Sequence, residues 1–330
     1  LSTTVHVWST GTILHYAGER WNNLTNAVTL NSLNGVWTSV DRNEMFAVGG
    51  NGIILHYDGS QWTTMPSGTT ANLTEIWGSS TNNVMAVGTD GAILHYDGSN
   101  WTTILTTNSP LYDIWGSSQG HVFAVGYNGK ILHYYNEHWT SMTSGVSSPL
   151  YGVWGTSENN VWAVGPYGVI LHYNGNFWEK MPIATTAVLS DVWGSSGNNV
   201  WAVSWGGTLL HYDGNQWRIM EKNTTQNLYT VWGTSQRDVS AAGAEGTILH
   251  YDGEYWRTMA SRSNTYFSDI EKNLRGDIFA VGTSGTILQY SGCMIGDMNC
   301  DEDINIFDIQ LLLNCIFHAG NCDYGDINED

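Results

Sequence analysis

The sequence has 330 residues, with 30 Asp and Glu against 11 Lys and Arg, so its formal net charge is −19. This charge argues against a nucleic acid or an anionic membrane surface as partner, because both require basic patches. The 42% hydrophobic content, with 17 Trp and 17 Tyr, excludes a disordered chain, and the sequence has no apolar run long enough to predict a membrane span.

A four-residue string repeats along most of the chain. The string Ile-Leu-His-Tyr, or a close variant, begins at residues 13, 54, 93, 131, 170, 209, 248 and 287, at intervals of 38–41 residues. The last copy reads Ile-Leu-Gln-Tyr. Self-similarity at a fixed period of this length is typical of repeat architectures such as propellers.

Each repeat unit contains four short runs with strand character. In the unit from Leu189 to Met220 they are LSDVWG (run a), NVWAV (run b), TLLHY (run c) and WRIM (run d). The runs are rich in β-branched and aromatic residues, lack helical periodicity, and are separated by turn residues such as Asp-Gly. Four strands per repeat predict the blade of a β-propeller, so the expected fold is all-β, with a β-propeller over residues 1–292.

The number of blades depends on how the two ends of the repeat array meet. Runs b and c occur eight times, whereas runs a and d occur seven times, because the first unit lacks run a and the last lacks run d. The count of strings favours eight blades, two of them three-stranded. In the alternative, a seven-bladed ring, the last three runs join the strand that begins at Trp21.

An incomplete blade would have a consequence for assembly. Its unpaired backbone could pair with a neighbouring chain, which would build a head-to-tail fibre of this protein. Ring closure within one chain is the simpler alternative.

Two residue types recur at fixed places in the repeat. Thirteen of the 17 Trp lie at the end of run a or the start of run d. We expect them to pack between blades, and the alternative is a ring of exposed platforms that stack sugars. We expect the His of each string to bond to a neighbouring blade rather than to ligate a metal, because no second ligand recurs with it.

The sequence H-Y-D-G-x-x-W between runs c and d resembles the Asp-box of BNR-type propellers. The resemblance covers nearly all of residues 5–292, although three copies depart from the motif, at Ala17, Asn136 and Asn174. Sialidases share that fold, and the resemblance implies that activity would require an arginine cluster, a Tyr nucleophile paired with Glu, and an Asp acid. The seven arginines of this chain are scattered and do not suggest such a cluster.

Catalysis is not expected on more general grounds either. A ring of similar blades repeats its residues, whereas an active site needs one unique constellation. Carboxylates recur at one place in run a, which is typical of repeat structure: Glu75, Asp113, Asp191 and Asp269. We therefore predict no enzyme and assign no catalytic residue.

All four cysteines lie in residues 293–330, at Cys293, Cys300, Cys315 and Cys322. An even number in a short segment predicts two disulfides and an oxidising compartment. A zinc site is the alternative, but the spacing C-x6-C-x14-C-x6-C lacks the close pairs that zinc favours. Four cysteines allow three pairings, and we prefer the one in which Cys293 pairs with Cys300 and Cys315 pairs with Cys322.

The same segment contains an acidic loop that resembles the dockerin calcium-binding repeat. Oxygen-bearing side chains at alternating positions suit Ca²⁺, which binds six to eight oxygen ligands, and an amphipathic helical pattern follows. By this resemblance, the calcium ligands are Asp297, Asn299, Asp301, Asp303 through its carbonyl, Asn305 directly or through water, and Asp308. A second, incomplete loop starts with Asp326, Asn328 and Asp330. Ile306 and Phe307 replace the small polar pair with which dockerins recognise cohesin, so cohesin is not an expected partner.

Together these features predict a secreted, extracellular protein of a bacterial cell surface. We expect a non-catalytic propeller for assembly or adhesion, with Ca²⁺ as its cofactor and a calcium-stabilised C-terminal docking segment. The expected partner is another protein or a second copy of the chain. A multivalent lectin that binds glycans is the alternative, and a glycoside-cleaving enzyme is the third hypothesis.

Overall fold

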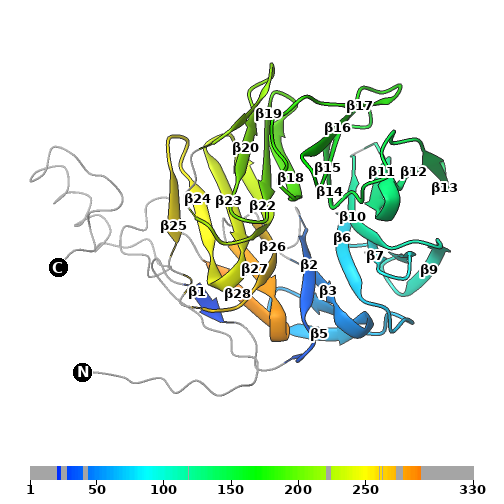
Figure 1. Cartoon of the computed structure of the whole chain (residues 1–330). Coiled ribbons are helices and arrows are strands. Elements are labelled where there is room, and N and C mark those ends of the chain that lie inside the picture. Colours follow the sequence, from blue (N-terminus) through cyan, green and yellow to red (C-terminus); the bar gives the residue numbers. More distant parts are fainter. Residues whose placement is uncertain are drawn as a thin grey trace, which may run out of the picture.

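The computed structural model describes residues 21–23, 28–39, 44–117, 119–220, 224–259, 261, 263–272 and 278–290. Within these ranges every regular element is a β-strand or a single turn of 3-10 helix, and none of the helices could cross a membrane. The strands form seven four-stranded antiparallel sheets around a central axis (Figure 1). The all-β propeller predicted from the sequence is confirmed.

Each sheet is one blade, in which strands a to d correspond to runs a to d of the repeat. Blades 1 to 3 contain β2 (Leu33–Thr38), β3 (Met45–Gly49), β4 (Ile54–Tyr57), β5 (Trp62–Met65); β6 (Leu73–Ser80), β7 (Asn83–Gly88), β8 (Ala92–Tyr96), β9 (Trp101–Thr106); and β10 (Leu111–Gly116), β11 (Val122–Gly126), β12 (Ile131–Tyr135), β13 (His138–Met142). Blades 4 to 6 contain β14 (Gly152–Ser157), β15 (Asn160–Gly165), β16 (Val169–Tyr173), β17 (Trp178–Lys180); β18 (Leu189–Ser196), β19 (Asn199–Ser204), β20 (Leu209–Tyr212), β21 (Trp217–Ile219); and β22 (Leu228–Ser235), β23 (Asp238–Gly243), β24 (Ile248–Tyr251), β25 (Trp256–Met259). Blade 7 contains β26 (Phe267–Lys272), β27 (Ile278–Gly282), β28 (Thr286–Tyr290) and β1 (Trp21–Asn23). Four turns between strands b and c are 3-10 helices: η1 (Gly50–Gly52), η2 (Tyr127–Gly129), η3 (Ala244–Gly246) and η4 (Thr283–Gly285).

The N-terminal strand β1 completes blade 7. It pairs antiparallel with β28, and Trp21 lies opposite Tyr290 as Trp62 lies opposite Tyr57 in blade 1. Figure 1 shows blue β1 beside orange β28. The ring therefore has seven blades, and the eight that the count of strings favoured are wrong, because the first unit supplies only the closing strand. The runs of that unit before Trp21 lie outside the described residues.

This closure also corrects the basis of the fibre hypothesis. The last repeat lacks a run d of its own, but β1 of the same chain fills that place in the sheet. The outer edge of β28 is thus paired within the chain and is not vacant for a neighbouring chain.

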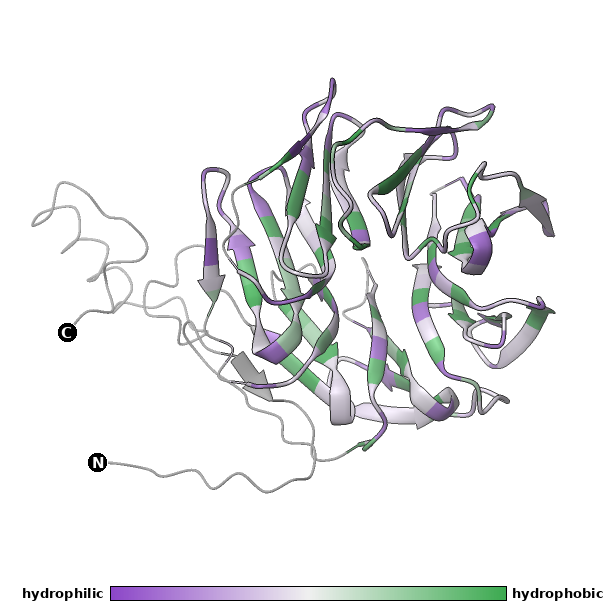
Figure 2. Cartoon of the chain, in the orientation of Figure 1, coloured by the Kyte–Doolittle hydropathy of each residue, from purple (hydrophilic) through white to green (hydrophobic). Residues whose placement is uncertain are grey.

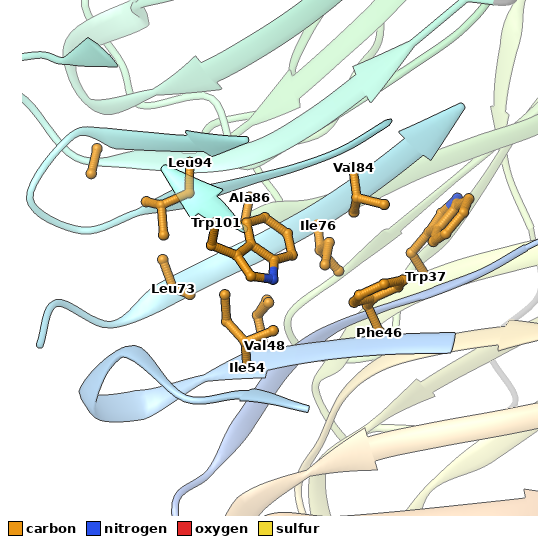
Figure 3. Packing of buried hydrophobic residues seen from close by; sticks show 11 residues of the cluster. Trp37, Phe46, Val48, Ile54, Leu73, Ile76, Val84, Ala86, Leu94 and Trp101 are labelled. Carbon is orange, nitrogen blue, oxygen red and sulfur yellow. The ribbon is translucent and has the colours of Figure 1, made fainter. Parts of the chain in front are cut away.

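The tryptophans at the start of strand d pack between blades, as predicted. The ring of Trp101 in blade 2 lies against Phe46, Val48 and Ile54 of blade 1 (Figure 3), with the Phe46 centroid 6.1 Å away. Five tryptophans at this position are 5–8% exposed: Trp62, Trp101, Trp178, Trp217 and Trp256. They are not exposed platforms, so they cannot stack sugars as the lectin hypothesis required.

The tryptophans that end run a pack over a glycine of the next blade. A Cβ atom on Gly78 would lie 2.9 Å from the ring of Trp37, and one on Gly116 would lie 2.5 Å from the ring of Trp77. The same relationship joins blades 3 to 6. In each Trp-Gly dipeptide, the Trp ring packs on the next blade, and the Gly leaves room for the Trp ring of the preceding blade. Hydrophobic residues accordingly recur along the inner strands of every blade (Figure 2).

The His of each string bonds within its own blade, which corrects the expectation of a contact with a neighbouring blade. His95 Nε2 lies 2.7 Å from Asn83 Oδ1, and His172 Nε2 lies 2.6 Å from Asn160 Oδ1. In both cases the partner is the first residue of strand b, 12 positions earlier. The contact links strands b and c at the open end of their hairpin, away from the b–c turn.

Candidate functional site at the centre of the ring

A cavity of about 390 Å³ lies where the first strands of all seven blades meet. Strand a is the innermost strand of each sheet, and its inner edge has no partner strand. Backbone groups at such an edge need other hydrogen-bond partners. The sequence of strand a supplies these partners from its third position.

The third position of strand a carries a carboxylate in four blades, named here the acid layer: Glu75, Asp113, Asp191 and Asp269. Each accepts a hydrogen bond from the backbone N–H of the residue that follows it. For example, Asp191 Oδ1 lies 2.7 Å from Val192 N, and Glu75 Oε1 lies 2.8 Å from Ile76 N. In four of the seven blades, the N–H group at this level of the inner edge is therefore bound by a carboxylate of the same strand.

In the other three blades, the corresponding N–H group donates to an aspartate of the preceding blade. Asp113 Oδ2 accepts from Val153 N of blade 4 at 2.5 Å, and Asp191 Oδ2 accepts from Val231 N of blade 6 at 2.8 Å. Asp269 Oδ2 closes the ring with Val36 N of blade 1 at 2.8 Å. Four carboxylates thus bind all seven inner N–H groups at this level, and each Asp uses both of its oxygens.

The three blades without a carboxylate have a small residue at the equivalent position for a steric reason. A Cβ atom on Gly35 would lie 2.3 Å from Glu75 Oε1, and one on Gly152 would lie 2.8 Å from the Cα of Asp191. In blade 6, Thr230 fits because its Oγ1 donates to Asp269 Oδ1 at 2.9 Å. The acid layer was predicted to be structural, and these contacts assign it that role.

Glu75 differs from the three aspartates of the acid layer. The next blade has its own carboxylate, Asp113, which already accepts from Ile114 N at 2.7 Å. Glu75 therefore has one N–H to accept from, and it uses Oε1. No hydrogen bond to its Oε2 forms within the described part of the chain, so this oxygen faces the cavity as a free acceptor.

Blade 7 adds a fifth carboxylate where the other blades have the tryptophan of run a. Glu271 Oε2 accepts from the backbone N–H of Thr38 in blade 1 at 2.8 Å. Glu271 thus joins blade 7 to blade 1 at the seam that β1 closes.

Burial raises the pKa of every carboxyl group around the cavity. The pKa of Asp191 rises to about 7 and that of Asp269 to about 6, with burial as the largest cause. The pKa values of Glu75, Asp113 and Glu271 lie well above the ordinary range, because the charges of neighbouring carboxylates add to the effect of burial. None of the described residues that line the cavity is a Lys or Arg.

The oxygens of these carboxylates do not converge as metal ligands. Among the described residues no group of three or more His, Cys, Asp or Glu side chains is placed to hold a metal ion. Backbone N–H groups occupy most of the oxygens, which leaves too few for the six to eight that calcium requires.

Aromatic side chains surround one end of the cavity, on the face of the ring that carries the turns between strands b and c, called here the b–c face. Tyr112 is the second residue of β10 in blade 3, Tyr151 directly precedes β14 in blade 4, and their ring centroids lie 5.4 Å apart. The ring of Trp205 in blade 5 lies 6.1 Å from that of Tyr151 and is nearly parallel to it, at 18°. Three blades are thereby joined by one continuous set of rings.

The adjacent turns extend this set outward. Tyr127 in η2 is 54% exposed, Tyr167 in the turn of blade 4 is 73% exposed, and Trp205 is 46% exposed. These five residues are named here the aromatic rim: Tyr112, Tyr127, Tyr151, Tyr167 and Trp205. Large exposed aromatic residues on adjacent blades mark an interaction surface more often than a structural one.

The turns that present the rim are held by specific backbone contacts. The turn of Trp205 continues into Gly206, which has φ of +78° and donates its N–H to Asn227 Oδ1 at 2.8 Å. Tyr167 itself has φ of +62°, in the left-handed region. A bulky residue is disfavoured there, whereas blades 1 and 3 use Asn51 and Asn128. The Tyr167 ring is mostly exposed, so buried packing does not offset this backbone strain.

The sequence reasoning located the acid layer but missed the aromatic rim. The available signal was departure from the repeat: the turns of blades 3 to 5 carry Tyr or Trp where blades 1, 2, 6 and 7 carry Gly, Thr, Ala, Asn, Asp, Glu or Ser. The Asp-box resemblance is reflected in the turns between strands c and d, where Asp58 Oδ1 accepts from the N–H groups of Ser60 and Gln61. The hydrogen bond from the Ser60 hydroxyl, with these two backbone bonds, lowers the pKa of Asp58 to about 2.

The predicted calcium ligands and cysteines lie outside the described residues. This holds for the whole segment from residue 293 to residue 330 and for both loops within it.

Comparison with solved structures supports the fold. The chain is similar to YCF48 from Cyanidioschyzon merolae, at 17% identity and a TM-score of 0.68, over 82% of this chain and 99% of that one. It is similar to YCF48 bound to D1 peptide, at 17% identity and a TM-score of 0.69, over 86% of this chain and 100% of that one. A third similar structure is the WD40 β-propeller domain of Doa1, at 12% identity and a TM-score of 0.68, over 79% of this chain and 93% of that one. No protein-family model and no curated protein sequence matches the chain.

Proposed function

We propose that the chain is a non-catalytic binding protein whose aromatic rim holds an extended segment of a partner protein. The observation that carries this proposal is the continuous contact of Tyr112, Tyr151 and Trp205 across three blades, beside the central cavity. Tyrosine and tryptophan provide large contact areas at a low entropic cost, and they dominate the energetics of protein interfaces.

Two further observations support binding over catalysis. The carboxylates that line the cavity bind backbone N–H groups, so most of their oxygens are engaged in holding the ring together. A similar propeller, YCF48, has been solved with a peptide bound. Binding of a partner segment fits the non-catalytic assembly or adhesion role expected from the sequence.

The test is selection of peptides from a random dodecapeptide library displayed on phage. The full chain and a rim variant, Tyr127→Thr with Tyr167→Asn and Trp205→Thr, would be compared for binding of the selected synthetic peptides. These replacements occur at the same turn positions in other blades, so the fold should tolerate them. The expected result is at least a tenfold loss of affinity in the rim variant.

The matched control uses exposed aromatic residues on the opposite face of the ring. Phe177 and Tyr255 lie in turns between strands c and d and are 59% and 60% exposed. Replacement of both by Ala should leave peptide affinity unchanged. Equal losses in the two variants, or no loss in the rim variant, would overturn the proposal.

We also propose that the protein acts outside the cell, with a C-terminal segment that binds Ca²⁺ and contains two disulfides. The support is the spacing of oxygen-bearing residues from Asp297 to Asp308 and the clustering of all four cysteines after residue 292. Equilibrium dialysis of the full chain against Ca²⁺ tests this. Binding that is lost in the variant Asp297→Ala with Asp301→Ala would support it, and equal binding by both proteins would contradict it.

A further inference from the structure

The cavity beside the aromatic rim has an unusual charge. Five carboxylates face it, and none of the described lining residues is a Lys or Arg. The tyrosines Tyr112, Tyr151 and Tyr229 are the other titratable groups in its lining. A water molecule takes ~30 Å³ in the liquid, so a cavity of about 390 Å³ has room for a long side chain with several waters.

The tyrosines and the carboxylates of this cavity are arranged in sequence along strand a. Tyr112 occupies the second position of its strand, at the b–c face, and Asp113 of the acid layer follows directly. The same order places Tyr151 ahead of Gly152, over which the next blade's Asp191 lies. A side chain that enters from the aromatic rim therefore reaches the acid layer one residue further along the strand.

The free oxygen in the acid layer belongs to Glu75. Three aspartates use both oxygens for backbone N–H groups, whereas Glu75 uses Oε1 alone. Its Oε1 lies over the backbone of Gly35, where a Cβ atom would be only 2.3 Å away. Glu75 Oε2 is thus an acceptor that the fold itself does not require, located in the cavity that adjoins the aromatic rim.

The electrostatics favour a cation with directional N–H donors. Burial raises the pKa of Glu75 most, and the charges of Asp269, Asp113 and Asp191 raise it further. A positive group among these carboxylates would replace that mutual repulsion by attraction. A metal ion is disfavoured, because the layer has too few free oxygens to coordinate it, whereas an ammonium or guanidinium group can donate to a single carboxylate.

We propose that the segment held by the aromatic rim inserts a Lys or Arg side chain into the central cavity, where the cation pairs with Glu75. This inference rests on the proposed function, since the rim positions the segment and the acid layer selects the inserted residue. Hydrogen bonds to charged groups are among the stronger polar contacts, so the pair should contribute about tenfold or more to affinity.

The experiment uses peptides selected on the full chain, together with Glu75→Gln. This variant keeps an Oε1 acceptor for Ile76 N and replaces only the free oxygen by an amide, so the ring should fold normally. Glu179→Gln, on the exposed outer strand of blade 4, is the control for loss of one negative charge. Each selected peptide would also be synthesised with its Lys or Arg replaced by Gln.

The expected result is enrichment of Lys or Arg at one fixed place in the selected peptides. Glu75→Gln and the peptide replacement should each weaken binding about tenfold, and the two losses should not add when combined. Glu179→Gln should leave affinity unchanged.

Two other outcomes would overturn the inference, and they differ in what they imply for the proposed function. Peptides that need the aromatic rim but show no cation preference and no response to Glu75→Gln would remove this inference and leave the rim as a binding site. A selection that yields no peptide dependent on the aromatic rim would remove both.

Discussion

Asp191 binds the inner edges of two neighbouring blades at once, because its Oδ2 accepts from the backbone N–H of Val231, 40 residues later in the chain. Its Oδ1 accepts from Val192 in its own blade. Asp113 and Asp269 have the same double role, and Asp269 uses it to join blade 7 to blade 1. The acid layer is therefore a set of contacts between blades at the point where the sheets have no strand partner.

This arrangement predicts an order of stability losses. Asp191→Ala should destabilise the protein by about 2 kcal/mol or more, because it leaves two backbone N–H groups unpaired. Glu75→Ala should cost less, since it leaves one. Urea unfolding of the two variants measures the difference, and an equal or larger loss for Glu75→Ala would contradict the assignment of these contacts.

The raised pKa values predict that stability depends on pH. The pKa of Asp191 is raised to about 7 and that of Asp269 to about 6, so between pH 4 and 7 the folded protein binds more protons than the unfolded chain. The free energy of unfolding should therefore fall as pH rises through this window. We expect a higher melting temperature at pH 5 than at pH 8.

Asp191→Asn provides the control for this pH effect. Relief of general negative charge also favours the acidic side, but it should be nearly equal in both proteins. The variant should be less stable at pH 5, and its melting temperature should change less between pH 5 and pH 8. An unchanged pH dependence would show that Asp191 does not titrate in this range.

Tyr167 should oppose stability. Its φ of +62° is costly for a bulky side chain, and its ring is 73% exposed, so little packing compensates for the strain. Tyr167→Asn should raise the free energy of unfolding by about 0.5–1 kcal/mol. Thermal unfolding measures this, and a loss of stability would mean that the ring makes a packing contact that its exposure does not reveal.

Ring closure within one chain is testable with a cysteine pair. Asn22 lies opposite Gln289 in the β1–β28 ladder. In the variant Asn22→Cys with Gln289→Cys, oxidation should yield a disulfide within one chain at every protein concentration, as peptide mapping by mass spectrometry can detect. A crosslink between chains that increases with concentration would instead restore the fibre hypothesis.

The sequence predicted the blades well because each strand repeats a local pattern. The Trp-Gly pair of run a places a ring against a glycine about one repeat later, and the Tyr-to-Trp pairing of runs c and d joins two residues five positions apart in the same blade. Such contacts recur with the period of the chain, so the period alone reveals them. The packing of Trp101 between blades 1 and 2 follows from the same regularity.

The sequence favours one blade too many because run c has eight copies, whereas the number of blades follows run a. Strand a faces the axis, and a blade without it would leave the centre of the ring unfilled, so the seven copies of run a determine the number of blades. The string around His15 suggested an eighth blade, yet only the strand from Trp21 joins the described ring.

The aromatic rim was not predicted because it exists only in three dimensions. Tyr112, Tyr151 and Trp205 are separated by dozens of residues, and only Tyr112 lies within a strand. A repeat analysis emphasises what blades share, whereas the exposed part of this surface, at Tyr127, Tyr167 and Trp205, consists of turn residues that blades 3 to 5 do not share with the others. Residues 293–330 lie outside the described residues, so the calcium and disulfide assignments stay predictions.

Hydrogen–deuterium exchange of the full chain, with and without a selected peptide, tests the central claim most directly. The account predicts that the peptide slows exchange in the b–c turns of blades 3, 4 and 5, around Tyr127, Tyr167 and Trp205, and leaves the turns around Phe177 and Tyr255 unchanged. Protection confined to the opposite face, or to the outer strands, would contradict the assignment of the aromatic rim as the binding site.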